Sequence, residues 1–375
     1  MTARAPRVVI AGGWTGGHLF CALAVAEALR RREPATALVL VGGRGGMEES
    51  LIRAAGFPVA TVVAETVGRR PTWESLAQNL ALPFKLAVGG FQALRLLRSF
   101  RPDVVVGVGA YVSLPVVAVA QTLAIPTLLH EANARPGLAN RVLARRAKVI
   151  CIGSDQAGHA FARGPRLVTT GNPVRSAVAA AATLSPVDAR TRLGLDPLRP
   201  TVLIMGGSLG TVRINDWVLA HARALIADGS QVLWACGRAH FGDCQARLGS
   251  AANPRLVPFL VPFLEDMAAA YAAADLVVAG AGASTVAELA CLGKAAVFIP
   301  DPTVTEDHQT RNATALRAAG AEVCSDGTLG VPLVLRVQAL LADPERRRVL
   351  GTRLAGLAHP DAAGAIAAEV VHLAG

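Results

Sequence analysis

An apolar run that ends in a glycine-rich turn occurs twice in this chain, once near the start of each half. Residues 7–20 read RVVIAGGWTGGHLF, and residues 201–215 read TVLIMGGSLGTVRIN. Each has the pattern of a buried strand that passes through glycines into a helix. Two such units, opening halves of similar length, predict two Rossmann-like, doubly wound α/β domains that face each other across a cleft.

Further apolar runs at regular intervals predict the remaining strands of two parallel sheets. The uncharged stretch 104–129 is long enough to span a membrane, but Pro115 and Pro126 divide it into strand, loop, helix and strand. We expect an N-terminal domain over 1–172, completed by a helix at about 358–375, and a C-terminal domain over 173–357. The expected strands are 7–11, 37–41, 59–64, 103–108, 126–129, 148–152, 167–169, 201–205, 231–235, 255–258, 275–279 and 295–299.

The composition excludes several classes of protein. With 375 residues, 52% of them hydrophobic and 17% charged, the chain can bury a large core and is not disordered. Six cysteines without a C-x-x-C pair indicate reduced, mostly buried thiols rather than a disulfide framework or a zinc site. Glycines interrupt the apolar run at the N-terminus, so no signal peptide is expected. These features fit a reducing cytoplasm.

The positive charge is concentrated in the first half. Residues 1–175 hold 21 Lys and Arg against 9 Asp and Glu, whereas residues 176–375 hold 16 against 18. A basic half can face nucleic acid, an anionic membrane or a phosphorylated substrate, or it can simply be solvated. Aromatic residues make up only 4% of the chain, which argues against nucleic acid as a partner.

Within the basic half, residues 82–101 (LPFKLAVGGFQALRLLRSFR) place apolar side chains among Lys and Arg. Such a helix can rest on an anionic bilayer surface, or it can be an ordinary amphipathic helix packed on the core. Gly89 and Gly90 weaken the prediction of a continuous helix here.

Glycine turns of this kind have a specific chemical use. A phosphate or sugar can reach backbone N–H groups at a helix N-terminus only where no side chain intervenes, although packing alone can also require glycine. A dinucleotide fingerprint would need glycine where Ala11 stands and an acidic residue near Val41 to Gly43, and no Walker motif is present. A different phosphorylated ligand is therefore favoured.

Seven stretches in order resemble the MurG family, the peptidoglycan N-acetylglucosaminyltransferases, over nearly the whole chain. They are AGGWTGGHLFCALAVAEAL, RPDVVVGVGAYVSLP, PTLLHEANARPGLANRVLA, VTTGNPVR, MGGSLGTVRIN, FLEDMAAAYAAADLVVAGAGASTVAELACLGKAAVFIP and DHQTRNATAL. The resemblance implies the GT-B fold and an inverting transfer of N-acetylglucosamine from UDP-N-acetylglucosamine to the C4 hydroxyl of undecaprenyl-linked lipid I, giving lipid II. It also implies a peripheral enzyme at the cytoplasmic face of the membrane.

The resemblance assigns the donor to the C-terminal domain. Glu288 matches the acid that binds the ribose hydroxyls, as suits a carboxylate with two acceptor oxygens. Gln309 and Asn312 match contacts to the donor sugar, and the backbone at Phe263 and Leu264 matches the uracil-binding edge. The remaining positions matched to donor binding are Thr15, Gly16, Gly17, Arg175, Gly207 and Ser208.

The resemblance assigns the acceptor to the N-terminal domain, with His18 and Glu131 as catalytic residues. His18 is a candidate general base because imidazole titrates near neutral pH, but a histidine at a helix N-terminus can equally bind phosphate. The acceptor positions are Gly16, His18, Tyr111, Asn133 and Asn140. No D-x-D motif is present, so we expect no cofactor and no protein-built metal site, with Mg²⁺ at most a non-essential companion of the substrate.

Several positions depart from the family pattern: Trp14, Cys21, Leu114, Ala132, Leu209, Val212, Gly280, Ala281 and His308. Losing polar side chains at a buried ligand costs about 1–3 kcal/mol each. Three hypotheses therefore stay open: the MurG activity itself, a diverged glycosyltransferase with another UDP-sugar or lipid acceptor, and a non-catalytic paralogue that binds nucleotide sugar.

Overall fold

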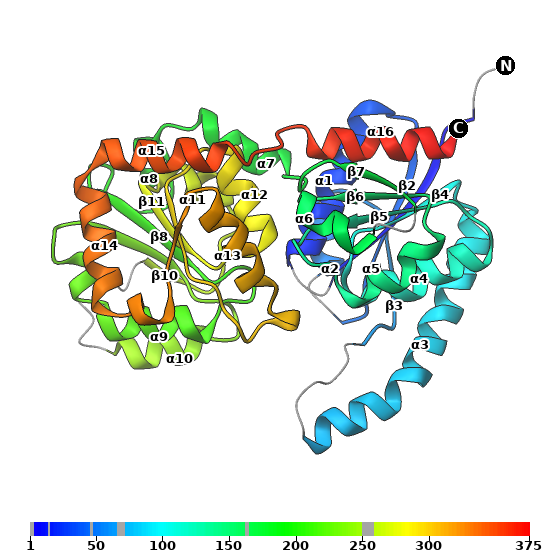
Figure 1. Cartoon of the computed structure of the whole chain (residues 1–375), viewed down its shortest axis with the longest axis horizontal. Coiled ribbons are helices and arrows are strands. Elements are labelled where there is room, and N and C mark those ends of the chain that lie inside the picture. Colours follow the sequence, from blue (N-terminus) through cyan, green and yellow to red (C-terminus); the bar gives the residue numbers. More distant parts are fainter. Residues whose placement is uncertain (1–3, 14–15, 46–47, 66–71, 162–164, 250–258) are drawn as a thin grey trace. The chain divides into compact units, whose positions relative to one another are not determined.

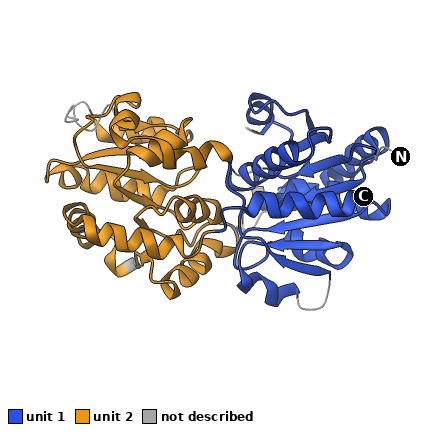
Figure 2. Ribbon diagram, turned by 90° about the horizontal axis from the view of Figure 1, so that it is seen from above, with its two compact units in different colours: residues 1–175, 359–375 blue, residues 176–358 orange. Residues whose placement is uncertain are grey.

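The structure, a computed structural model, describes residues 4–13, 16–45, 48–65, 72–161, 165–249 and 259–375. The chain forms two compact units (Figures 1 and 2): residues 1–175 with 359–375, and residues 176–358. The first division falls three residues after the expected boundary at 172.

Unit 1 is built on a seven-stranded parallel sheet with the order β3-β2-β1-β4-β5-β6-β7. The order reverses between β1 and β4, which is where doubly wound folds bind their ligands. The strands are β1 (Arg7–Ala11), β2 (Ala37–Gly43), β3 (Val59–Val62), β4 (Val104–Gly107), β5 (Thr127–Glu131), β6 (Val149–Ile152) and β7 (Arg166–Thr169).

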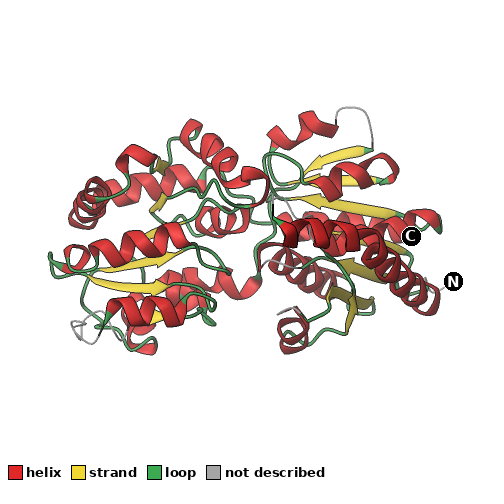
Figure 3. Cartoon of the chain, turned by 90° about the horizontal axis from the view of Figure 1, so that it is seen from below, coloured by secondary structure: helices red, strands yellow, loops and turns green. Residues whose placement is uncertain are grey.

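Helices cover both faces of this sheet (Figure 3). This is expected where helices and strands alternate along the chain, because each face of the sheet must be buried. One buried cluster joins the sheet to α1 and α16, and a second joins the opposite face to α3, α4 and α5. The last helix of the chain thus completes unit 1. The helices are α1 (Gly16–Arg32), α2 (Glu48–Ala54), α3 (Trp73–Phe100), α4 (Ala110–Thr122), α5 (Leu138–Leu143), α6 (Asp155–Gly158) and α16 (Ala362–Ala374).

Unit 2 repeats the design with a six-stranded parallel sheet, β10-β9-β8-β11-β12-β13, which reverses between β8 and β11. Its strands are β8 (Thr201–Met205), β9 (Gln231–Ala235), β10 (Leu260–Val261), β11 (Leu276–Ala279), β12 (Ala296–Phe298) and β13 (Glu322–Val323). Its helices are α7 (Ser176–Ala179), α8 (Pro186–Arg192), α9 (Val212–His221), α10 (Phe241–Leu248), α11 (Met267–Ala273), α12 (Ala283–Cys291), α13 (His308–Ala318), α14 (Val331–Ala342) and α15 (Pro344–Ala355).

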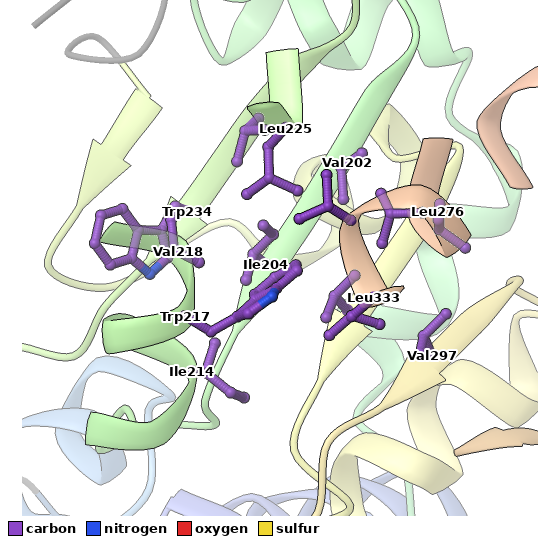
Figure 4. Close-up of a cluster of buried hydrophobic side chains, with 14 of the residues drawn as sticks. Val202, Ile204, Ile214, Trp217, Val218, Leu225, Trp234, Leu276, Val297 and Leu333 are labelled. Carbon is purple, nitrogen blue, oxygen red and sulfur yellow. The ribbon is translucent and has the colours of Figure 1, made fainter. Parts of the chain in front are cut away.

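Two tryptophans help to fix the core of unit 2 (Figure 4), because each buries its ring and still satisfies its indole N–H. Trp217 donates to the Gly330 carbonyl at 3.1 Å, and Trp234 donates to Asn215 Oδ1 at 3.1 Å. The core therefore has a defined packing on the side of the sheet that carries α9 and α14.

Most expected strands are present with boundaries that agree to within two residues. The strand expected at 255–258 lies outside the described residues, and the two-residue strands β10 and β13 were not predicted. The stretch 104–129 folds as β4, α4 and β5, so it is not a membrane span. Pro115, however, does not divide it: this proline lies inside α4.

Helix α3 is longer than the expected 82–101 and runs unbroken through both glycines, so the weakening predicted there was wrong. A Cβ on Gly89 would lie 2.1 Å from the Val63 carbonyl oxygen, and Gln92 Oε1 accepts the Val63 N–H at 2.7 Å. Gly89 is therefore needed for close approach to the chain after β3. The N-terminal part of α3 extends away from the sheet in Figure 1 and exposes Trp73 (85%) and Phe84 (74%).

Candidate active site

The first glycine turn lies at the carboxyl end of β1, and packing accounts for two of its glycines. A Cβ on Gly12 would lie 2.2 Å from Val108 Cγ2, and one on Gly13 would lie 2.6 Å from Glu48 Oε1. The turn then enters α1, whose first two residues are Gly16 and Gly17. Thr15 and the departure Trp14 lie outside the described residues.

His18 stands in the first turn of α1 and rests on the turn between β4 and α4. A Cβ on Gly109 would lie 2.9 Å from His18 Nε2 and 3.9 Å from Asn140 Nδ2. The structure therefore brings the imidazole and the Asn140 amide to the same point. Gly109 has φ 93° and Ala110 has φ 62°, a left-handed pair that turns the chain just before Tyr111.

Glu131 ends β5, and its carboxylate accepts four hydrogen bonds from N–H donors of the following loop and of α5. Its Oε1 accepts from the Asn133 backbone N–H at 2.9 Å and from Asn133 Nδ2 at 3.3 Å, and its Oε2 accepts from the Gly137 N–H at 3.0 Å and from Asn140 Nδ2 at 2.8 Å. Burial raises the pKa of this carboxyl, and these bonds oppose the rise. The geometry therefore favours a structural role for this carboxylate, which is to hold the loop, rather than a role in proton transfer.

His130 precedes Glu131 and is completely buried in β5. Its Nε2–H donates to the Gly171 carbonyl at 3.3 Å, while its Nδ1 has no hydrogen-bond partner among the described residues. Burial lowers the pKa of His130 to about 4, so this imidazole is neutral at physiological pH. Sequence reasoning did not single out this residue, although it adjoins Glu131 in the chain.

Arg175, the last residue of the first segment of unit 1, lies beside α1. Its guanidinium carbon stands 3.8 Å above the centre of the Phe20 ring, and its Nε is buried without a hydrogen-bond partner among the described residues. Stacking of this kind leaves the edge of the guanidinium able to bind an anion. Arg175 thus stacks on Phe20, which lies two residues beyond His18 on α1.

The second glycine turn lies at the carboxyl end of β8 and contains two glycines that packing requires and one, Gly207, that has open space beside it. A Cβ on Gly206 would lie 2.3 Å from the Thr211 nitrogen, and one on Gly210 would lie 2.0 Å from the Cys236 oxygen. Gly207 has φ 87° and nothing within 4 Å of its Cβ position. Its backbone is therefore open to a ligand, next to Ser208.

Two departures from the family pattern, Leu209 and Val212, are on the surface of this turn. Their side chains are 54% and 58% exposed, so neither fills the core of unit 2. An exposed aliphatic side chain offers a ligand contact area but no hydrogen bond.

A second group of predicted residues gathers around the turn between β11 and α12. Gln309 Oε1 accepts the N–H of Ala281 and that of Asp301, each at 3.1 Å, and Asn312 Nδ2 donates to the Ala281 carbonyl at 3.0 Å. Both amides thus brace this turn, which leads into α12 and its buried Glu288.

Sequence reasoning missed one contact in unit 2. Tyr271 of α11 donates its phenol hydrogen to Glu288 Oε2 at 2.7 Å.

The two residues that the resemblance places at the uracil edge follow β10. Leu264 is buried just beyond this strand, and the centre of the Phe263 ring lies 4.9 Å from the Arg238 guanidinium carbon. Among the described residues no group of three His, Cys, Asp or Glu could hold a metal ion.

The two-domain architecture with a glycine turn in each sheet is that of a glycosyltransferase with the GT-B fold. The N-terminal domain of glycosyltransferase family 28 matches residues 8–152, and the C-terminal domain of that family matches residues 201–347. The chain belongs to glycosyltransferase family 28.

Relatives match over almost their full length. A protein of Phocaeicola vulgatus is 36% identical over 98% of this chain and 96% of its own, and one of Salinibacter ruber is 38% identical over 100% and 98%. Both are named UDP-N-acetylglucosamine--N-acetylmuramyl-(pentapeptide) pyrophosphoryl-undecaprenol N-acetylglucosamine transferase. The crystal structure of Acinetobacter baumannii MurG is 29% identical with a TM-score of 0.69, covering 98% of this chain and 99% of its own.

Proposed function

We propose that this protein transfers N-acetylglucosamine, with inversion, from UDP-N-acetylglucosamine to the C4 hydroxyl of the N-acetylmuramoyl-pentapeptide of undecaprenyl-pyrophosphate-linked lipid I. The product is lipid II for peptidoglycan. The observation that carries the proposal is identity of 36–38% along the whole chain to relatives named for this reaction.

In this proposal the donor binds unit 2. Glu288 accepts hydrogen bonds from the ribose hydroxyls, and the open backbone at Gly207 with Ser208 receives the diphosphate. Gln309 and Asn312 hold the turn that borders the sugar. The acceptor binds unit 1, where His18 takes the proton of the attacking hydroxyl as the bond from C1 of the sugar to UDP breaks. Arg175, which is matched to donor binding, binds the negative charge of the UDP diphosphate.

The exposed Leu209 and Val212 favour one alternative, a glycosyltransferase of the same family with another donor. Calorimetric titration of the purified protein with UDP-N-acetylglucosamine and with UDP-glucose separates the two. Micromolar binding of the former alone, followed by transfer to lipid I, supports the proposal. Preference for UDP-glucose supports a diverged enzyme, and binding without any transfer supports a non-catalytic paralogue.

We also propose that catalysis needs no resident metal or cofactor. The carboxylates nearest the assigned site are engaged by N–H and O–H donors, as at Glu131 and Glu288. Turnover should therefore persist in EDTA, with Mg²⁺ changing the rate only through the nucleotide diphosphate. Complete loss of activity on chelation, restored by one bound ion per chain, is the contrary result.

We further propose that α3 rests on the cytoplasmic face of the membrane, where the lipid-linked acceptor lies. Helix α3 is long and apolar enough to cross a bilayer by length and composition, and only 17% of its apolar 18-residue stretch within Ser75–Phe100 is buried. Its other half, however, is fixed to unit 1 through Gly89 and Gln92. Partial insertion of the exposed half is consistent with both facts.

Vesicle co-sedimentation tests this placement. Replacing Leu80 (75% exposed) and Phe84 (74%) by Ser should weaken binding to phosphatidylglycerol vesicles at least tenfold, because each side chain contributes about 1.5–3 kcal/mol when it leaves water. The matched control replaces Val331 and Leu335, each 60% exposed on α14, by Ser and should bind normally. Equal binding by both double variants contradicts the assignment to α3.

A further inference from the structure

The ring of Phe20 contacts a charged side chain. Phe20 is the only phenylalanine, tyrosine or tryptophan of α1, and it packs against the core of unit 1. The guanidinium carbon of Arg175 stands 3.8 Å above the centre of this ring. A leucine would pack on the same core, as Leu19 and Leu23 do, but it has no aromatic face to attract a cation. The ring itself is therefore the feature that needs explanation.

The segment that carries Arg175 is anchored to unit 1 a few residues earlier. Gly171 has φ 77°, and its carbonyl accepts a hydrogen bond from His130 Nε2 at 3.3 Å. Asn172 Nδ2 donates to the Ala132 carbonyl at 3.0 Å. These contacts fix the backbone as far as Asn172, but they do not involve the guanidinium group of Arg175, which the contact with the ring holds.

The guanidinium of Arg175 stands at the end of a long side chain. Fixing an arginine side chain in one conformation costs up to about 2 kcal/mol of rotamer entropy. The Phe20 ring offsets part of this cost before a ligand binds, because it attracts the cation to its face. A guanidinium that lies on a ring keeps its N–H donors at its edge, where they can form paired hydrogen bonds with phosphate oxygens.

We propose that Phe20 is a positioning residue that holds the Arg175 guanidinium ready for the diphosphate of UDP. The inference rests on the proposed function, in which Arg175 binds that diphosphate. Phe20 acts through Arg175 and does not itself touch the substrate. Because α1 also carries His18 two residues earlier, one helix then sets the positions of the proposed base and of the cation that receives the leaving group.

Calorimetric titration of the full-length protein with UDP tests the proposal in a double-mutant cycle. Phe20→Leu should raise the Kd for UDP about fivefold, the size of a partly desolvated cation–π contact. Arg175→Gln should raise it about tenfold or more, since it removes a hydrogen-bonded charge. Adding Phe20→Leu to Arg175→Gln should change the Kd by less than about twofold, because the ring then has no cation to hold.

The cycle separates positioning from a general loss of packing. If Phe20→Leu raises the Kd equally with and without Arg175, the ring acts on something other than this cation and the proposal is overturned. Leu29→Val, at a residue of α1 that is 0% exposed, should lower Tm while leaving the Kd for UDP unchanged. Unchanged UDP binding by Arg175→Gln overturns this inference alone and leaves the transfer reaction standing. If the wild type does not bind UDP, the proposed function itself fails, and that failure is visible before any variant is made.

A second measurement remains available if Phe20→Leu does not fold. The Arg175 Nε is buried, which slows exchange of its proton with water, and its NMR resonance is assigned by its loss in Arg175→Gln. In the wild type this resonance should lie upfield of other arginines, because the ring current shields protons above the ring. Saturating UDP should shift it yet leave it upfield. A resonance that UDP does not shift, or that moves to the ordinary arginine position, overturns the proposal.

Discussion

His18 is the residue on which the chemical step of the proposed reaction depends. Its imidazole lies against Gly109 and near the Asn140 amide, at the carboxyl ends of β1 and β4. His18→Ala should reduce kcat about 10²-fold or more and remove the acidic limb of the pH profile, since a general base must be unprotonated to act. His159→Ala, an exposed histidine of the same unit, is the control. Near-normal turnover of the first variant excludes the base and leaves phosphate binding as its role.

His130 makes the stability of unit 1 depend on pH in a defined direction. Its pKa is lowered from 6.5 to about 4 by burial, so the unfolded chain takes up a proton that the folded chain does not. The resulting loss of stability is absent well above pH 6.5, grows as the pH falls, and reaches its full size below about pH 4. It should cost about 2 kcal/mol at pH 5.

Denaturant unfolding at pH 7.5, 6 and 5 measures this contribution. His130→Gln can still donate to the Gly171 carbonyl but cannot titrate, so its unfolding free energy should fall less over that range than that of the wild type. His159→Gln should keep the wild-type slope, because that ring is exposed. Parallel curves for wild type and His130→Gln would show that another group causes the loss.

At the scale of single elements, two adjacent glycines of α3 have opposite requirements. Gly90 has space, since the nearest atom to its Cβ position is Val119 Cγ2 at 3.9 Å, whereas Gly89 would place its Cβ 2.1 Å from the Val63 oxygen. Gly90→Ala should stabilise the protein by up to about 1 kcal/mol through helix propensity. Gly89→Ala should destabilise it by about 1–3 kcal/mol because the backbone must move apart.

The matched pair is measured by thermal or denaturant unfolding of the two variants under one set of conditions. Both substitutions add one methyl group to the same helix at neighbouring positions. The gain in helix propensity is therefore the same for both, and it cancels when their changes in unfolding free energy are subtracted. If both stabilise, α3 does not depend on its approach to Val63.

The sequence predicted elements well where a pattern repeats over many residues, and poorly where a single distant contact decides. Strands 7–11, 201–205 and 231–235 were placed to the residue because buried parallel strands are continuous apolar runs. Gly89 was taken as a weakness because the Val63 carbonyl that requires it is remote in the chain. Tyr271 was missed because its partner, Glu288, lies on another helix.

Roles were harder to predict than positions. Glu131 was expected among the catalytic residues, and the motif places it correctly at the end of β5. Its four N–H donors come from the following loop and from Asn140 of α5, an arrangement that no residue pattern specifies. Its catalytic role stays a prediction, and the geometry favours a positioning one.

For the whole molecule, the assignment of donor to unit 2 and acceptor to unit 1 predicts where ligands slow amide exchange. UDP-N-acetylglucosamine should protect the turns at 206–211 and 280–284, because the proposed function places the diphosphate at the open Gly207 backbone and Gln309 holds the second turn through Ala281. Exchange in α3 should not change with the donor and should slow only when anionic vesicles are added. Hydrogen exchange read by mass spectrometry distinguishes the two responses in one protein. Protection by the donor confined to the turn at 107–112 of unit 1 would mean that the nucleotide binds there, and that the roles of the two glycine turns must be exchanged.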